Sequence, residues 1–93
     1  MTTKVVNIKK EKYDVYIGRG GKFNYFGNPF KIGIDGNREE VIKKYKEWFD
    51  KQIQTNIIFK RKIHSLKGKI LGCFCKPLSC HGDIIAEYLN KND

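Results

Sequence analysis

Residues 68–83 read GKILGCFCKPLSCHGD and contain all three cysteines and one of the two histidines of the chain. Residues 69–75 are typical of a buried strand, and a tight turn is expected at Pro77. A helix is expected to begin near His81. Sites in α/β proteins commonly form at such strand-to-helix junctions, outside the carboxyl ends of the strands. The stretch therefore predicts an α/β fold with a functional site at this junction.

The segments outside this stretch predict two more strands and three helices. These elements are expected at residues 4–8, 13–17, 37–52, 57–66 and 81–90. The connector of residues 9–12 is too short for a crossover between parallel strands, so the first two strands are expected to form an antiparallel hairpin. We therefore predict a small single α/β domain over residues 1–93, in which three helices pack against a short sheet made of the hairpin and the strand at 69–75.

Residues typical of helix N-termini support two of the expected helices. Asn37 fits the N-cap position, and Glu40 three residues later completes a capping box. Thr55 or Asn56 can cap the second helix, and Gly68 is expected to end it. The apolar residues of the first helix fall at helical spacing and predict a stripe that faces the core, made of Val41, Ile42, Tyr45, Trp48 and Phe49.

Charge and hydropathy restrict the classes of partner. The 93 residues include 19 Lys and Arg against 10 Asp and Glu, which gives a formal charge of +9. Such a balance favours a nucleic acid, a nucleotide or another anionic partner, although lysine is also the ordinary residue of a solvated surface. The chain shows no signal-peptide features and no run of about 20 apolar residues, so no membrane partner is expected. We expect a cytoplasmic protein, in the host cytoplasm if it is viral, where thiols stay reduced.

A glycine-rich segment over residues 18–36 is expected to be a loop, and a loop of this length in a small domain is usually functional. Its run GRGG at residues 18–21 includes Arg19 and Gly20. This run resembles a turn whose backbone N–H groups converge on an anion. A plain flexible turn is the alternative, because the main role of glycine is to allow positive φ.

Two further polar residues are candidates for contact with a ligand, one within this loop and one just after it. Asn28 precedes Pro29, and the proline keeps the asparagine out of the helical region. This rigidity suits a positioned amide, and it equally suits a structural turn. Arg38 lies in the first turn of the following helix and is a candidate for contact with a ligand.

The cysteines and the neighbouring histidine form a C-x-C-x4-C-H pattern that admits three interpretations. A structural zinc site would use Cys73, Cys75, Cys80 and His81 as its four ligands, although the spacing differs from the usual paired motifs. A second interpretation is that Cys73 and Cys75 are small core side chains, since cysteine is among the most often buried residues.

The third interpretation is an anion or nucleotide site at the start of the last helix, where unpaired N–H groups carry partial positive charge. His81 would help to hold the anion. Cys80 would have a lowered pKa at this position, which would make it a better nucleophile. Asp83 would hydrogen-bond a ligand hydroxyl or orient His81, unless its carboxylate already neutralises the helix end.

Four motifs, in their order along the chain, resemble the domain-of-unknown-function family 4326. They are VYIGR at residues 15–19, GNPF at 27–30, DGNREE at 35–40 and LGCFCKP with CHGD within 71–83. The resemblance implies a small stand-alone protein of the kind found in bacteria, phages and large viruses. It implies an α/β domain and no particular activity. The residues that belong to the family pattern are Arg19, Asn28, Arg38, Cys75, Cys80, His81 and Asp83.

These observations predict a protein that binds a small phosphorylated, nucleotide-like ligand, as a viral or phage accessory protein. Its arginines would pair with phosphate, and an aromatic side chain such as Tyr25 or Phe26 would stack on the ligand. No cofactor is expected. The expected ligand-binding residues are Arg19, Gly20, Asn28, Arg38, Cys75, Cys80, His81 and Asp83.

Two alternatives belong to other functional classes. The first is a hydrolase or transferase that acts on a nucleoside or nucleotide, with Cys80 as nucleophile or with His81 and Asp83 as an acid–base pair. The second is a nucleic-acid-binding module stabilised by zinc at the four-ligand site described above.

Overall fold

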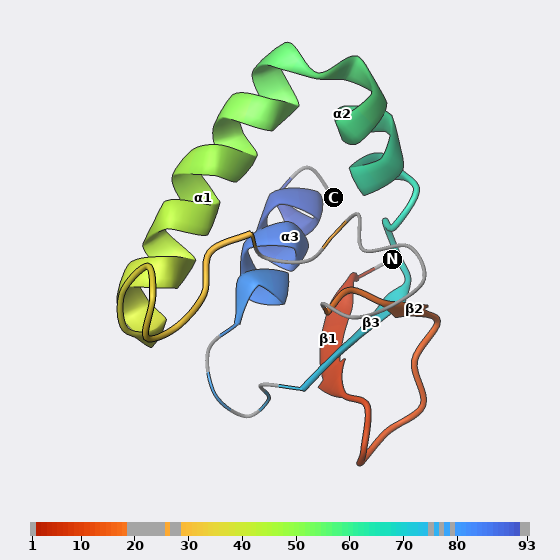
Figure 1. Cartoon of the computed structure of the whole chain (residues 1–93). Helices are drawn as coiled ribbons and strands as arrows, with labels where there is room; N and C mark the ends of the chain where they lie inside the picture. The colour runs from red at the N-terminus through yellow and green to blue at the C-terminus, as the bar shows by residue number, and fades with distance from the viewer. Residues whose placement is uncertain are drawn as a thin grey trace.

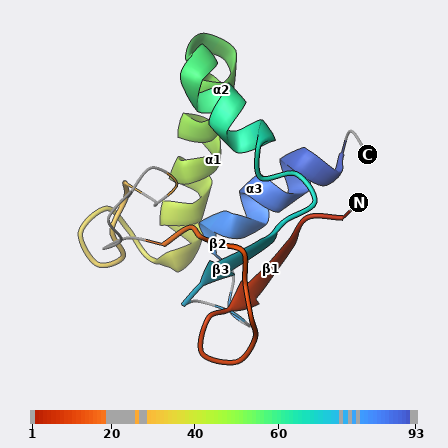
Figure 2. The ribbon, with the colours of Figure 1, turned by 90° about the vertical axis from the view of Figure 1, so that its right-hand side faces the viewer.

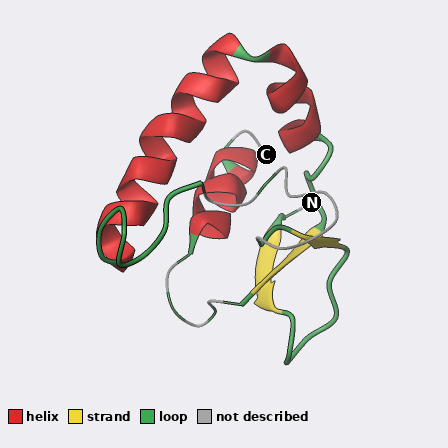
Figure 3. Cartoon of the chain, in the orientation of Figure 1, coloured by secondary structure: helices red, strands yellow, loops and turns green. Residues whose placement is uncertain are grey.

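The computed structural model of the chain describes residues 2–18, 26, 29–74, 76, 78 and 80–91 (Figure 1). Its strands are β1 (Lys4–Asn7), β2 (Val15–Tyr16) and β3 (Ile70–Cys73). Its helices are α1 (Arg38–Thr55), α2 (Ile57–His64) and α3 (His81–Asn90). These described helices and a parallel three-stranded sheet confirm the predicted α/β class (Figure 3). None of the helices described is both long enough and apolar enough to span a membrane.

β3 is the central strand of the sheet. It pairs in parallel with β1 on one side and with β2 on the other, so that Val5 and Val15 both lie opposite Leu71. The predicted antiparallel hairpin is therefore wrong. The connector of residues 8–14 can return to the start of the sheet because the strands are short. Its extended reach is about 23 Å, whereas a strand of the length of β1 spans about 13 Å.

The core lies between the sheet and the helices, which all lie on one side of the sheet (Figure 2). Leu71 and Cys73 alternate with Gly72 along β3, so they share the side that faces the helices, and both are buried. From α1, Phe49 is fully buried against them in the same cluster. Its ring meets the Phe59 ring of α2 edge to face, with centroids 5.6 Å apart, and this contact joins the two helices.

Asparagine residues cap the starts of both α1 and α2. The capping box predicted for α1 is confirmed, since the Glu40 N–H donates to Asn37 Oδ1 at 2.9 Å and the Asn37 N–H donates to Glu40 Oε1 at 3.0 Å. α1 continues to Thr55, past its predicted end. Asn56 then begins α2 by accepting the Phe59 N–H at 3.1 Å. A single residue therefore turns the chain between the two helices.

α3 approaches the sheet closely at Gly82, in the first turn of the helix. A Cβ atom at this position would lie 2.6 Å from Ile17 Cδ1 and 3.1 Å from Val5 Cγ1. Val5 belongs to β1, and Ile17 directly follows β2 and is completely buried. Glycine at position 82 therefore sets how near the start of α3 lies to the sheet.

We expect Gly82→Ala to lower the free energy of unfolding by about 1–2 kcal/mol. The added methyl group must displace Ile17 within a close-packed core, and the helical preference for alanine opposes this effect only in part. Urea denaturation measures the change. Glu87→Ala, at an exposed position of the same helix, is the control and should stay within about 0.5 kcal/mol of the parent. A Gly82→Ala variant as stable as the parent would contradict the close approach.

Candidate functional site

The carboxyl end of the sheet meets the start of α3. β3 ends at Cys73, and Cys80 is the N-cap of α3. His81, the first residue of the helix, donates from Nε2 to the carbonyl oxygen of Ile17 at 2.7 Å. Because Ile17 directly follows β2, the ends of two strands and the start of a helix lie together here. This is the junction at which the sequence predicts a site.

His81 is held by this hydrogen bond and by a ring contact. Its side chain is only 8% exposed, and its ring meets the Tyr45 ring edge to face with centroids 5.2 Å apart. A carbonyl oxygen only accepts hydrogen bonds, so Nε2 of His81 must carry a proton. The imidazole therefore fixes the end of β2, from which the chain continues into Arg19.

Asp83 caps the same helix from within its first turn. Its Oδ2 accepts the Cys80 N–H at 3.1 Å, and its Oδ1 accepts from the ammonium group of Lys76. Burial lowers the pKa of Lys76, but the hydrogen bond and charge of Asp83 outweigh it and raise that pKa above its ordinary value. Both carboxylate oxygens are engaged in these contacts, and the contacts described for Asp83 do not include the expected bond to His81.

Asn7 fixes the chain between β3 and α3. Its Nδ2 donates to the carbonyl oxygen of Lys76 at 2.7 Å and to that of Phe74 at 3.4 Å. Asn7 is the last residue of β1, so one amide group links the ends of β1 and β3. Neither Asn7 nor Lys76 was among the predicted site residues. The available signal was a polar amide between the apolar residues Val6 and Ile8 of an expected strand.

Cys73 and Cys80 are two buried free thiols. Their Sγ atoms lie 3.3 Å apart, and the side chains are 1% and 2% exposed. This confirms the interpretation of Cys73 as a core side chain. The hydrogen bond with Cys73, then burial and the charge of Asp83, raise the pKa of the Cys80 thiol. The predicted lowered pKa is therefore wrong, because these effects outweigh that of the helix start. The geometry does not favour Cys80 as a nucleophile.

In a Cys75→Ser background, we expect Cys73 and Cys80 to resist a thiol reagent such as dithionitrobenzoate at pH 8 while the protein is folded. Both thiols are buried, and at a pH below its raised pKa the Cys80 thiol stays protonated and is a poor nucleophile. The absorbance of the thiolate that the reagent releases measures the reaction. Both thiols should react once urea unfolds the protein, and rapid reaction of the folded protein would contradict their burial.

The zinc alternative requires Cys73, Cys75, Cys80 and His81 around one point. Among the residues that the structure describes, no three Cys, His, Asp or Glu side chains gather as a possible metal site. Nε2 of His81 is engaged with the Ile17 carbonyl, and Cys75 lies outside the described residues. The zinc site therefore stays a prediction that metal analysis can test.

Of the other predicted ligand-binding residues, the structure describes Arg38 alone. Outside the described part of the chain lie Arg19, Gly20, Asn28 and Cys75, whose roles stay predictions. Arg38 is the first residue of α1 and is half-buried. It precedes Tyr45 by seven residues, which places both on one side of the helix, about 10 Å apart along its axis. Arg38 therefore lies on the side of α1 that meets His81.

Tyr45, which was predicted as part of the apolar stripe, carries a buried hydroxyl group. Its side chain is fully buried, and the hydroxyl has no hydrogen-bond partner among the described residues. Burial, followed by the nearby Cys80 thiol, raises the pKa of this hydroxyl above its ordinary value. An unpaired buried hydroxyl is unfavourable by about 1–3 kcal/mol, so Tyr45 is a candidate functional residue. The available signal was a tyrosine where phenylalanine would fill the stripe without this penalty.

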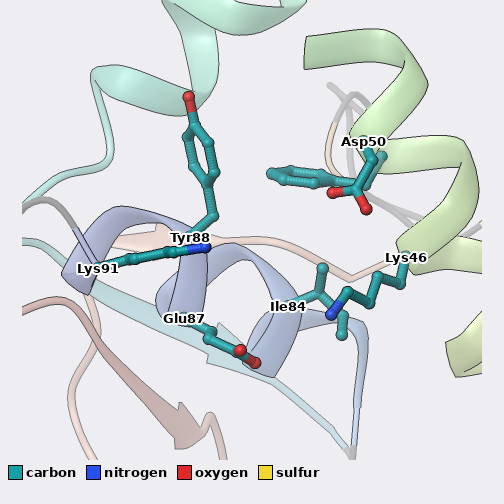
Figure 4. A pocket seen from close by; sticks show the side chains of 7 residues that line it. Lys46, Asp50, Ile84, Glu87, Tyr88 and Lys91 are labelled. Atoms are coloured by element: carbon teal, nitrogen blue, oxygen red, sulfur yellow. The ribbon is translucent and has the colours of Figure 1, made fainter. Parts of the chain in front are cut away.

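A cavity of about 160 Å³ lies elsewhere, between α1 and α3 (Figure 4). Its charged lining residues are two cations and two anions, Lys46, Lys91, Asp50 and Glu87. Ligand pockets usually measure about 300–1,000 Å³ and are mostly apolar. This cavity is too small and too evenly charged for a phosphorylated ligand, so the junction is the better candidate.

Comparisons with known proteins support the resemblance that the motifs gave. A family model described as "Domain of unknown function (DUF4326)" matches residues 2–91. The chain is also similar to an uncharacterized 12.4 kDa protein from the nrdA-td intergenic region of Enterobacteria phage T4. The two are 43% identical over 89 residues, which cover 95% of this chain and 78% of the phage protein. No solved structure matches the chain.

Proposed function

The chain belongs to the family described as Domain of unknown function (DUF4326), and we propose that it binds a small phosphorylated, nucleotide-like ligand. One observation carries the proposal. The ends of β2 and β3 lie together with the start of α3, at the edge where open α/β sheets bind ligands. From Ile17, which His81 holds, the chain leads directly into the glycine-rich run at residues 18–21.

Three cationic side chains support a phosphorylated ligand. Arg38 lies on the side of α1 that meets His81, and Arg19 follows closely on the strand end that His81 holds. Their guanidinium groups would each bind phosphate through paired hydrogen bonds. Asp83 holds the ammonium group of Lys76 beside the start of α3, where Lys76 would offer the ligand a hydrogen-bond donor from within a neutral ion pair. Asn28 would contact a hydroxyl group or the base of the ligand.

The hydroxyl group of Tyr45 supports a polar ligand atom at the same place. The Tyr45 ring contacts the His81 ring, the Cys80 thiol affects the pKa of the hydroxyl, and the hydroxyl has no hydrogen-bond partner among the described residues. Since the side chain is fully buried, a ligand would reach the hydroxyl only after the residues above it move. Binding would therefore be coupled to a local rearrangement of the protein.

We expect a thermal-shift screen of nucleotides and cyclic nucleotides at low salt to identify a stabilising ligand. At 100 times its Kd such a ligand should raise the melting temperature by about 10–20 °C. Arg38→Ala should remove most of this shift, because the phosphate loses a charged partner. Arg61→Ala, at an exposed position of α2, is the matched control and should keep the shift.

Tyr45→Phe separates contact with the ligand from a structural role. It should leave the ligand-free protein as stable or about 1 kcal/mol more stable, while reducing the shift. The control Tyr88→Phe removes a hydroxyl that His64 Nε2 contacts at 2.8 Å, and the shift should remain. The absence of any stabilising nucleotide would contradict the proposal, as would a full shift in both Arg38→Ala and Tyr45→Phe.

The same samples test the two alternatives. A hydrolase or transferase would convert the ligand during prolonged incubation, which mass spectrometry detects, although Cys80 is buried and protonated. A zinc-stabilised nucleic-acid-binding module would carry about one zinc ion per chain and unfold when a chelator removes it. A folded preparation free of metal would exclude the second alternative.

A further inference from the structure

The side of the sheet that faces away from the helices is formed by outward side chains of all three strands. Paired residues of parallel strands point to the same side, so Val6, Tyr16 and Gly72 share one face. Phe74 follows Gly72 by two residues and points the same way. Within the described residues no helix covers this face (Figure 2). Sheets of parallel strands are usually covered on both faces. Here the connector after β1 takes the place of a helix, since Val6 is only 3% exposed and Ile8 and Tyr13 lie over Gly72.

Three aromatic rings gather on this face. The rings of Tyr16 and Phe74 meet edge to face, with centroids 5.7 Å apart. Tyr13 lies over β3, since a Cβ atom at Gly72 would come within 2.7 Å of Tyr13 Cγ. The Phe74 side chain is 55% exposed and that of Tyr13 is 43% exposed. Large aromatic side chains that water can reach, beside one another on a sheet, are typical of surfaces on which unpaired bases stack.

Positive charge borders these rings. The connector between β1 and β2 carries Lys9, Lys10 and Lys12, all exposed, and residues 8–13 line an open hollow of about 530 Å³. The two acidic residues of the connector are engaged within the protein. Glu11 pairs with Lys4 at 3.7 Å, and Asp14 accepts the Ile70 N–H at 2.8 Å.

We infer that this helix-free face binds single-stranded nucleic acid. Bases would stack on Phe74 and on the neighbouring tyrosines, and the phosphate groups would lie along Lys9, Lys10 and Lys12. A duplex would not suit the surface, because its bases are stacked on one another and cannot lie against the rings. A second copy of a chain with a charge of +9 would be repelled by the same lysines. The inference does not rest on the ligand site proposed above, because Phe74, Tyr13 and the three lysines have no role in that site.

Fluorescence anisotropy with a labelled 12-nucleotide single strand of mixed sequence, as DNA and as RNA, tests the inference. Phe74→Ala and Phe74→Leu should each weaken binding by about 5- to 100-fold, because loss of one base–aromatic stack has an effect of that size. Phe74→Trp should keep or strengthen binding, since it retains an aromatic surface. Phe74 is more than half exposed, so these variants should fold, and circular dichroism checks that they do.

The lysines are tested by the salt dependence of the same binding. The double variant Lys9→Gln and Lys10→Gln should bind more weakly. The magnitude of its slope of log K against log salt should fall by up to about 1.4, because each phosphate of a single strand that a lysine neutralises contributes about 0.7 to that magnitude. The control removes the same charge from exposed positions of α1, as Lys43→Gln and Lys51→Gln. It should keep the slope of the parent.

Several results would overturn the inference. The first is that neither the DNA nor the RNA strand binds at low salt. The second is that a duplex of the same sequence binds with equal affinity. The third is that both Phe74→Ala and Phe74→Leu keep the affinity of the parent. If sedimentation shows instead that the parent protein is a dimer and that Phe74→Ala is a monomer, the face is an interface between two copies of the chain. Each of these results leaves the nucleotide screen unaffected, because Phe74, Lys9 and Lys10 are not among the residues proposed to bind the nucleotide-like ligand.

Discussion

The absence of a side chain at Gly82 allows α3 to begin directly against the sheet. The neighbouring contacts depend on that short distance, since His81 reaches the Ile17 carbonyl and the Cys80 thiol lies beside that of Cys73. A bulkier residue at position 82 would move the helix start away from the strand ends. That movement would separate His81 from the Ile17 carbonyl and the two thiols from each other. Glycine at position 82 therefore allows the contacts that form the candidate site.

The helices and the fold class follow from local signals in the sequence. The capping box needs only Asn37 and Glu40, which are three residues apart, so its formation could be predicted without knowledge of the fold. The pairing of β1 and β2 could not be predicted in this way, because both pair with β3, which lies far along the chain. The rule that short connectors make hairpins assumes strands of ordinary length. β2 consists of only Val15 and Tyr16, so even a short connector can cross over.

The position of the candidate site was predictable, whereas the roles of its residues were not. The spacing of Cys73, Cys80 and His81 places them where a strand ends and a helix begins. Spacing does not show which way an N-cap side chain points, and Cys80 points into the core, where its thiol stays protonated. Tyr45 was missed for a related reason. Most of its side chain is apolar, so its hydroxyl does not disturb the pattern of the buried stripe of α1.

The order of the strands also affects how the protein forms during translation. The ribosome makes β1 and β2 first, but the partner that both have in the described sheet is β3, more than 50 residues later. α1 can form meanwhile, because the hydrogen bonds of a helix are local. The segments that become β1 and β2 therefore lack their pairing partner until most of the protein has been synthesised. Formation of the sheet therefore waits for contacts between segments far apart in the sequence, which form more slowly than the local contacts of a helix.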